Sequence, residues 1–151
     1  MERRKKVGLI CSPGGHLVEV LQLAEAFADC SVFFMTYRGQ TAFDRKNTYY
    51  LQNFAKNPLT LIPGIAKILY VFLKERPSLL FSTGAEIAIP AFYIGKFLFR
   101  TKLIYLECSA QVYAPSLTGR CVYAIADLFL VQWESLLKRY GPRATYAGGL
   151  V

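Results

Sequence analysis

Residues 6–16 read Lys-Val-Gly-Leu-Ile-Cys-Ser-Pro-Gly-Gly-His, an apolar run that ends in a glycine turn. The run from Lys6 to Cys11 has the length and composition of a buried strand. Beyond the turn, apolar residues recur at the spacing of one helix face, at Leu17, Val20, Leu21, Ala24 and Phe27. This stretch therefore predicts a strand that leads through a tight turn into a helix.

The rest of the chain repeats this alternation of strand and helix. Further strands are predicted at residues 31–36, 78–82, 102–106, 128–131 and 144–147. Further helices are predicted at residues 65–76, 86–99, 116–126 and 134–140. Residues 37–59 show no clear period and predict a long irregular connection. Regular alternation is typical of a parallel sheet with helices on both faces, so we expect an α/β fold with residues 1–151 as a single domain.

The composition excludes several classes of protein. The 151 residues are 54% hydrophobic, which excludes a disordered tail or a low-complexity linker. Lys and Arg number 18 against 10 Asp and Glu, so the net charge is +8, and the candidate partners are nucleic acid, an anionic membrane or a phosphorylated substrate. Because the basic residues are scattered and no nucleic-acid-binding motif occurs, we expect no nucleic-acid partner.

The spacing of cysteine and histidine argues against a metal centre. The sequence has one histidine, no Cys-x-x-Cys pair and no Asp-x-Asp pair, so we expect no metal ion and no cofactor. A chain with its own core does not need disulfides, and we expect reduced thiols in a cytoplasm-facing protein. The four widely spaced cysteines are Cys11, Cys30, Cys108 and Cys121.

Two apolar segments, residues 61–73 and 85–99, are shorter than the roughly 20 residues that cross a bilayer. Aromatic and basic side chains accompany them, as in helices that lie on an anionic membrane surface. Ordinary core helices with solvated lysines are the alternative. We expect peripheral attachment without a transmembrane span, and the candidate membrane-contacting residues are Lys67, Tyr70, Phe72, Phe92, Lys96 and Phe97.

Three loops follow predicted strands, at the edge where a parallel sheet binds its ligands. They begin at Ser12, Thr83 and Glu107. Gly14 and Gly15 in the first loop let the backbone approach a ligand, and the helix that follows offers free N–H groups that suit a diphosphate. An ordinary tight turn explains the same glycines equally well.

Two titratable side chains belong to these loops. His16 stands at the start of a helix, whose positive dipole disfavours the imidazolium form and leaves a neutral ring to accept a proton. Glu107 follows the strand at 102–106 and brings a carboxylate to the same edge. The alternatives are a histidine with no catalytic task and an acid that caps or braces a loop.

A series of short motifs carries a family resemblance. In chain order they are Tyr105-Leu106-Glu107-Cys108-Ser109, Pro115-Ser116-Leu117-Thr118-Gly119, Ala126-Asp127, Val131-Gln132-Trp133-Glu134 and Tyr146-Ala147-Gly148. The series resembles the PssD-type exopolysaccharide subunits of bacteria. It is also similar to the membrane-anchor subunit of the eukaryotic enzyme that adds the second N-acetylglucosamine to dolichol-linked chitobiose. The glycine loops at residues 12–16 and 82–84 fall where that family has its own.

The resemblance implies a Rossmann-like domain equivalent to the N-terminal, acceptor-binding half of a GT-B glycosyltransferase of the MurG type. The UDP-sugar-binding half would be a separate catalytic partner, PssE-like, without which the chain is inactive. The chain would hold a polyprenyl- or dolichyl-diphosphate-linked saccharide at the cytoplasmic face of the membrane. The sugar transferred would be N-acetylglucosamine or another hexose or uronic acid.

The resemblance also implies roles for single residues. It assigns catalysis to His16 and Glu107, and contacts with the acceptor or its diphosphate to Ser12, Gly14, Gly15, Thr83, Gly84 and Ser109. The sequence departs from the family at Cys108 and Gln111, where the family usually has a serine and an arginine. Two other functions stay open, a non-catalytic scaffold that only recruits the catalytic partner and a free-standing nucleotide-binding protein.

Overall fold

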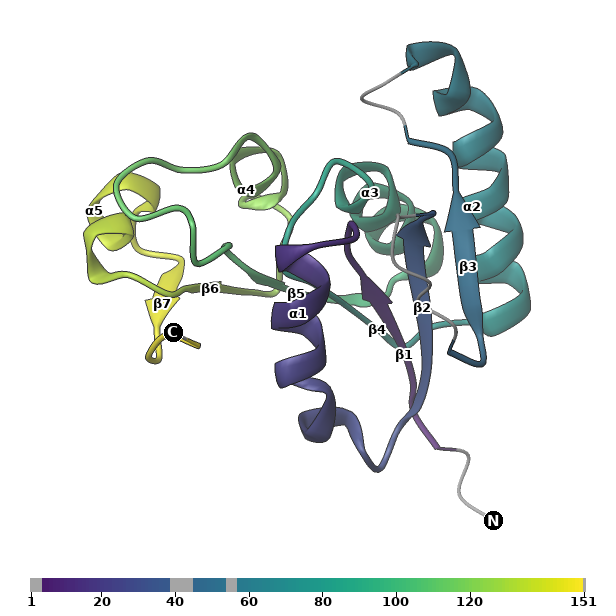
Figure 1. The fold of residues 1–151 in the computed structure, drawn as a ribbon, viewed down its shortest axis with the longest axis horizontal. Helices are drawn as coiled ribbons and strands as arrows, with labels where there is room; N and C mark the ends of the chain where they lie inside the picture. Colours follow the sequence, from purple (N-terminus) through teal and green to yellow (C-terminus); the bar gives the residue numbers. More distant parts are fainter. Residues whose placement is uncertain (1–3, 39–44, 54–56, 151) are drawn as a thin grey trace.

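A computed structural model of the chain describes residues 4–38, 45–53 and 57–150, and its described part is built on one seven-stranded sheet (Figure 1). Every neighbouring pair of strands is parallel, and the strand order is β3-β2-β1-β4-β5-β6-β7. The strands are β1 (Lys6–Ile10), β2 (Ser31–Tyr37), β3 (Thr48–Leu51), β4 (Leu79–Ser82), β5 (Lys102–Leu106), β6 (Leu128–Val131) and β7 (Ala144–Tyr146).

Helices cover both faces of the sheet. The short helices α1 (Gly15–Gln22) and η1 (Ala24–Phe27) pack on one face, where Val7 and Leu9 of β1 join Val20 in a buried cluster. The opposite face carries α2 (Leu61–Glu75), α3 (Ala88–Phe99), α4 (Leu117–Val122) and α5 (Leu137–Tyr140). Ile10 points into that second cluster, because successive side chains of a strand face opposite sides. Two further turns of 3₁₀ helix are η2 (Pro58–Thr60) and η3 (Glu134–Leu136).

The structure confirms the predicted α/β class and six of the strands, and it corrects the segment at 37–59. That segment was expected to be irregular, yet Thr48–Leu51 forms β3 and pairs with β2. Three half-buried residues and one buried leucine at the edge of a sheet carry no apolar run or alternation, which is why the pattern was missed. Residues 39–44 and 54–56 of the predicted connection lie outside the described residues.

Several predicted helix boundaries also differ from the structure, and two of them by four residues. The helix predicted at 65–76 begins at Leu61 and contains Pro63 in its first turn, where a missing N–H breaks no helical hydrogen bond. The helix predicted at 116–126 ends at Val122. No helix of the described ranges is long and apolar enough to span a bilayer.

The candidate membrane-contacting residues separate into two groups. The predicted membrane contacts of Phe72 and Phe92 are wrong, because both side chains are fully buried where α2 and α3 pack on the sheet. Tyr70 and Phe97 are 60% and 65% exposed, and Lys67 is also exposed. Lys96 is half-buried, and its ammonium lies 2.8 Å from Oδ1 of Asp127.

Candidate functional site

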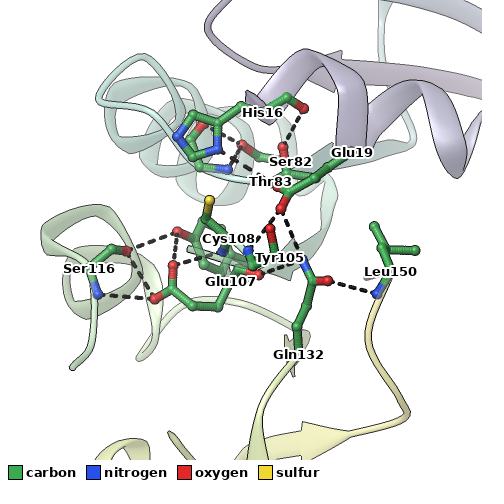
Figure 2. Close-up of polar contacts among 12 residues, drawn as sticks. His16, Glu19, Ser82, Thr83, Tyr105, Glu107, Cys108, Ser116, Gln132 and Leu150 are labelled. Atoms are coloured by element: carbon green, nitrogen blue, oxygen red, sulfur yellow. Dashed lines mark hydrogen bonds and ion pairs between the residues drawn. The ribbon is translucent and has the colours of Figure 1, made fainter. Parts of the chain in front are cut away.

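The candidate site lies at the carboxyl ends of β1, β4 and β5, which are neighbours in the sheet. The chain winds outward from β1 through β2 and β3, then returns to β4 and winds outward in the other direction. Open parallel sheets bind ligands at such a switch point. The three loops singled out in the sequence meet here, and Figure 2 shows their polar contacts. We call this edge the carboxyl rim.

The first loop of the carboxyl rim leaves its glycines open. Gly14 has φ 95°, a left-handed conformation that glycine adopts without strain, and it caps α1. Gly14 and Gly15 are exposed, and a Cβ built on either would meet nothing within 4 Å. Ser12 is half-buried beside them. The start of α1 therefore faces open space, as binding of an anion there requires.

The second loop packs tightly against His16. Gly84 has φ 130°, and a Cβ at this position would lie 2.6 Å from Cε1 of the imidazole, so the ring rests directly on the glycine backbone. The hydroxyl of Ser82 accepts the N–H of Gly84 and donates to the Gly84 carbonyl. Thr83 is buried and donates its hydroxyl to the His16 carbonyl at 2.8 Å. The resemblance implied that Thr83 contacts the acceptor; in the structure its buried side chain ties the two loops together.

Glu107 is the hub of the third loop. Its carboxylate is fully buried and accepts hydrogen bonds from five donors: the N–H groups of Cys108 and Ser116, the hydroxyl of Ser116, and the phenols of Tyr105 and Tyr140. Both oxygens are thereby occupied. The sequence left two roles open for Glu107, a catalytic carboxylate and an acid that braces a loop. This geometry favours the bracing role, and no contact supports a catalytic one.

The phenols around Glu107 are held in their protonated form. Burial, together with the negative charge of Glu107, raises the pKa of Tyr105 far above its ordinary value. Burial and the hydrogen bond to the same carboxylate raise the pKa of Tyr140 in the same direction. A protonated phenol can only donate to a carboxylate, so both tyrosines act as hydrogen-bond donors to Glu107.

Close packing around Glu107 explains the Ser116-Leu117-Thr118-Gly119 motif. Ser116 caps α4 by accepting the N–H of Gly119 at 2.8 Å. A Cβ on Gly119 would lie 2.0 Å from the phenol oxygen of Tyr140 and 2.5 Å from Oε2 of Glu107. Only glycine leaves room there for the carboxylate and its donor.

Sequence reasoning missed a second buried carboxylate, that of Glu19 in α1. Its Oε1 accepts the N–H of Ser109 at 2.8 Å and the side-chain N–H of Gln132 at 3.2 Å. Oε2 has no hydrogen-bond partner among the described residues, and it lies 3.9 Å from Nδ1 of His16. Glu19 follows His16 by three residues, so both lie on one helix face, and this spacing was the signal available in the sequence.

The Gln132-Trp133 pair holds the third loop and the end of the chain. The amide of Gln132 donates to the Glu107 carbonyl at 3.1 Å, and its oxygen accepts the N–H of Leu150 at 2.9 Å. The indole of Trp133 donates to the carbonyl of Ser109 at 2.7 Å. Both the N–H and the carbonyl of Ser109 are thus hydrogen-bonded, and these backbone contacts hold the residue at the carboxyl rim.

The fold brings Cys108 next to His16 and Glu19, which are neighbours on α1. Ligand atoms of His16, Glu19 and Cys108 all lie within 4.8 Å of one another, although the spacing of cysteine and histidine predicted no such cluster. Burial, followed by the nearby charges of Glu19 and Glu107, raises the pKa of the Cys108 thiol. All four cysteines are free.

A cavity of about 670 Å³ lies beside the rim, at the carboxyl ends of β2 and β3. It is lined by β3, by the start of α2 and by two basic side chains, Arg38 and Lys67. Next to it, η2 and the start of α2 carry three exposed apolar side chains, Leu59, Leu61 and Ile62, which we call the apolar tip of α2. An apolar surface therefore adjoins a basic, partly aromatic cavity.

Comparison with known proteins identifies relatives of this chain. Residues 47–150 match the family described as "Oligosaccharide biosynthesis protein Alg14 like". The UDP-N-acetylglucosamine transferase subunit ALG14 of Candida albicans is 40% identical over 85 residues, which are 52% of this chain and 38% of that protein. The same subunit of Yarrowia lipolytica is 32% identical over 106 residues, 66% of this chain and 48% of that protein. The chain thus spans less than half the length of these relatives.

Solved structures confirm the fold. MurG of Acinetobacter baumannii superimposes with a TM-score of 0.75 at 14% identity, over 97% of this chain and 46% of that one. The UDP-GlcNAc 2-epimerase of Methanocaldococcus jannaschii gives a TM-score of 0.73 at 11% identity, over 95% and 45% of the two chains. The described sheet and helices therefore have the Rossmann-like architecture of about half of each of these proteins.

Proposed function

The chain belongs to the Alg14-like family of oligosaccharide biosynthesis proteins, and we propose that it is the acceptor-binding, membrane-recruiting subunit of a two-protein glycosyltransferase. The transfer proposed is of N-acetylglucosamine from its UDP derivative to a saccharide linked to a polyprenyl or dolichyl diphosphate. The observation that carries the proposal is the open glycine turn at the start of α1, at the switch point of a domain that matches about half of MurG.

The acceptor diphosphate is proposed to bind at the start of α1. Its charge would meet the exposed backbone at Gly14 and Gly15, where free N–H groups and the helix dipole favour an anion. The basic cavity beside the rim, with Arg38 and Lys67, offers room for the saccharide or the second phosphate. The rim and the cavity together suit a ligand that is both anionic and polyhydroxylated.

The apolar tip of α2 is proposed to lie on the membrane. Leu59 and Ile62 are 82% and 78% exposed, and Tyr70 and Leu73 extend the same apolar surface along α2. Lys67 and Lys74 accompany them, so the surface combines apolar and basic groups, as interfacial helices do. A lipid-linked acceptor could then enter the cavity from the bilayer.

The nucleotide sugar is proposed to bind to a separate catalytic subunit, PssE-like. Support comes from the relatives, which are named as subunits of a UDP-N-acetylglucosamine transferase. The active site would form between this rim and that subunit. The single domain described here would then have no donor site of its own.

His16 is the proposed base of the transfer. An acceptor hydroxyl would attack the anomeric carbon as it passes its proton to the imidazole, the bond from that carbon to UDP would break, and the linkage would invert. Free N–H groups of the first loop would offset the negative charge of the diphosphate. The buried Glu107 would support the loop without touching the acceptor.

Reconstitution tests the proposed function. The chain and its catalytic partner, together and separately, would be given UDP-N-acetylglucosamine and a polyprenyl-diphosphate-linked acceptor. Transfer is expected only when both proteins are present, and transfer by this chain without its partner would refute the proposal. Tight binding of a mononucleotide by the isolated chain would instead favour a free-standing nucleotide-binding protein.

The His16→Ala variant tests the base. We expect transfer by the pair to fall by about 100-fold or more, because general base catalysis contributes about 10²–10⁴-fold. Gln22→Ala, on the exposed end of α1, is the matched control and should leave the rate unchanged. Full activity of His16→Ala in a pair that still assembles would favour the non-catalytic scaffold.

Flotation with acidic liposomes at low salt tests the membrane surface. Replacing both Leu59 and Ile62 with aspartate should lower the fraction bound at least tenfold, since each buried side chain of this size contributes about 1.5–3 kcal/mol. Val18→Asp is the control, because Val18 is also exposed but lies on α1, across the sheet. Equal losses in both variants would show that α2 is not the surface that binds.

A further inference from the structure

We propose that His16, Glu19 and Cys108 form a binding site for one divalent cation of the zinc type. A ring nitrogen, a carboxylate oxygen and a thiol sulfur of these residues lie within 4.8 Å of one another. They come from the start of α1 and from the loop after β5, so the fold rather than the sequence assembles the cluster (Figure 2).

The carboxylate of Glu19 has one oxygen left over for a cation. Its side chain is 7% exposed, and the N–H groups of Ser109 and Gln132 both bond to Oε1. Oε2 is left buried without a hydrogen-bond partner in the described part of the chain, on the side that faces His16. A buried carboxylate oxygen without a partner is costly, and a bound cation removes that cost.

The imidazole of His16 presents a second buried polar atom that has no hydrogen-bond partner among the described residues. Nδ1 of His16 is buried, has no hydrogen-bond partner within the described ranges and lies 3.9 Å from Oε2 of Glu19. The ring cannot move away through Gly84, whose backbone it touches. Hydrogen bonds that orient the ligands from behind, as those of Ser109 and Gln132 orient Glu19, accompany metal sites generally.

The donor set indicates which cation fits. Nitrogen, oxygen and thiolate sulfur together suit Zn²⁺ or Co²⁺, whereas Mg²⁺ and Ca²⁺ prefer oxygen alone. Bond lengths of about 2.0–2.3 Å require the ligand atoms to approach one another by a few tenths of an ångström to about 1 Å. Cys108 would lose its proton on binding, so the thiolate and Glu19 would neutralise the two positive charges. Three protein ligands leave a fourth position for water or a ligand oxygen.

The cation site has a consequence for transfer, and this consequence rests on the proposed function. An imidazole bound to a metal through Nδ1 carries its proton on Nε2 and cannot accept another. The loaded site would therefore remove His16 from proton transfer. Binding of the cation does not depend on that proposal and is tested without any activity.

Titration of the reduced full chain with Co²⁺ tests the site directly. We expect one Co²⁺ per chain, with a near-ultraviolet charge-transfer band from a single thiolate, and displacement by Zn²⁺ should abolish that band. Cys108→Ser should lose the band, and Glu19→Gln should weaken binding by about tenfold or more. Cys30→Ser and Cys121→Ser are matched controls, half-exposed like Cys108, and should retain it.

Two outcomes would overturn the site. One is the absence of stoichiometric Co²⁺ binding by a chain whose cooperative thermal unfolding shows that it is folded. The other is a charge-transfer band that survives in Cys108→Ser or disappears in Cys121→Ser. Since none of these readouts involves sugar transfer, failure of the site would leave the proposed function standing, and the reverse also holds.

Discussion

Two buried carboxylates lie at the same carboxyl rim, and they differ in how their oxygens are used. Glu107 accepts five hydrogen bonds, which occupy both oxygens. Glu19 accepts two, both at Oε1, and its Oε2 has no hydrogen-bond partner among the residues described. The two residues are similarly buried, at 0% and 5% exposure.

This difference distinguishes a carboxylate that stabilises the rim from one that can bind a ligand there. A buried carboxylate with all its positions filled by donors stabilises the loop that supplies them, and it has nothing left for a substrate or an ion. A buried carboxylate with one oxygen that accepts no hydrogen bond lacks a partner there, and a ligand that binds to this oxygen stabilises it. Glu107 is therefore assigned to the structure of the rim, and Glu19 to what the rim binds.

The largest expected effect is the loss of stability in Glu107→Ala. The substitution leaves the N–H groups of Cys108 and Ser116, the hydroxyl of Ser116 and two phenols without their acceptor. Because each buried unsatisfied donor costs about 1–3 kcal/mol, we expect the free energy of unfolding to fall by about 4 kcal/mol. Urea unfolding of the variant measures it, with the exposed Glu134→Ala as the control. A loss below about 1 kcal/mol would show that Glu107 is no brace.

A third carboxylate, Glu75, gives a smaller effect that depends on pH. It lies at the opposite end of the sheet, where Lys6 is 2.7 Å from Oε2 and the phenol of Tyr49 donates to Oε1. Burial opposes its ionisation, but the hydrogen bonds and charges of Lys6, Tyr49 and Lys74 outweigh burial and hold the pKa of Glu75 below its ordinary 4.5. Its ionised form therefore stabilises the fold above that pH.

The sign of this effect is fixed by the lowered pKa of Glu75. The stabilisation is complete above about pH 4.5 and is lost as the pH falls through the lower pKa of the folded state. Wild-type protein should exceed Glu75→Gln in unfolding free energy by about 1.5 kcal/mol at pH 7, and the difference should shrink toward pH 3. A difference that grows on acidification would contradict the assignment.

Most of the fold could be predicted from the sequence because buried strands and helices have clear patterns. The run from Lys6 to Cys11 and the stripe after it are examples. β3 could not be predicted, since Thr48–Leu51 is an edge strand of four residues with no apolar run or alternation. Phe72 and Phe92 were wrongly assigned to the membrane because an apolar helix looks alike whether protein or lipid covers it.

The site was predicted only where one loop suffices to define it. Gly14, Gly15 and His16 are contiguous and lie at the rim as expected. Thr83 and Glu107 also lie at the correct strand ends, but their side chains turn inward, and side-chain direction depends on partners from other elements. Glu19 was missed for the same reason, since its partners Ser109 and Gln132 are 90 and 113 residues away.

The smallest expected effect, that of Glu19→Gln on stability, is the sharpest test of the comparison. The amide keeps an oxygen for the donors on Ser109 and Gln132 and removes a buried charge whose second oxygen has no hydrogen-bond partner within the described part of the chain. We therefore expect a loss of less than about 1 kcal/mol, or a gain. Urea unfolding measures it, and the exposed Glu25→Gln is the control. A loss as large as that of Glu107→Ala would mean that Glu19 is a second brace and that its open oxygen awaits no ligand. A stable variant that no longer binds Co²⁺ would instead show that fold and binding use separate carboxylates on one rim.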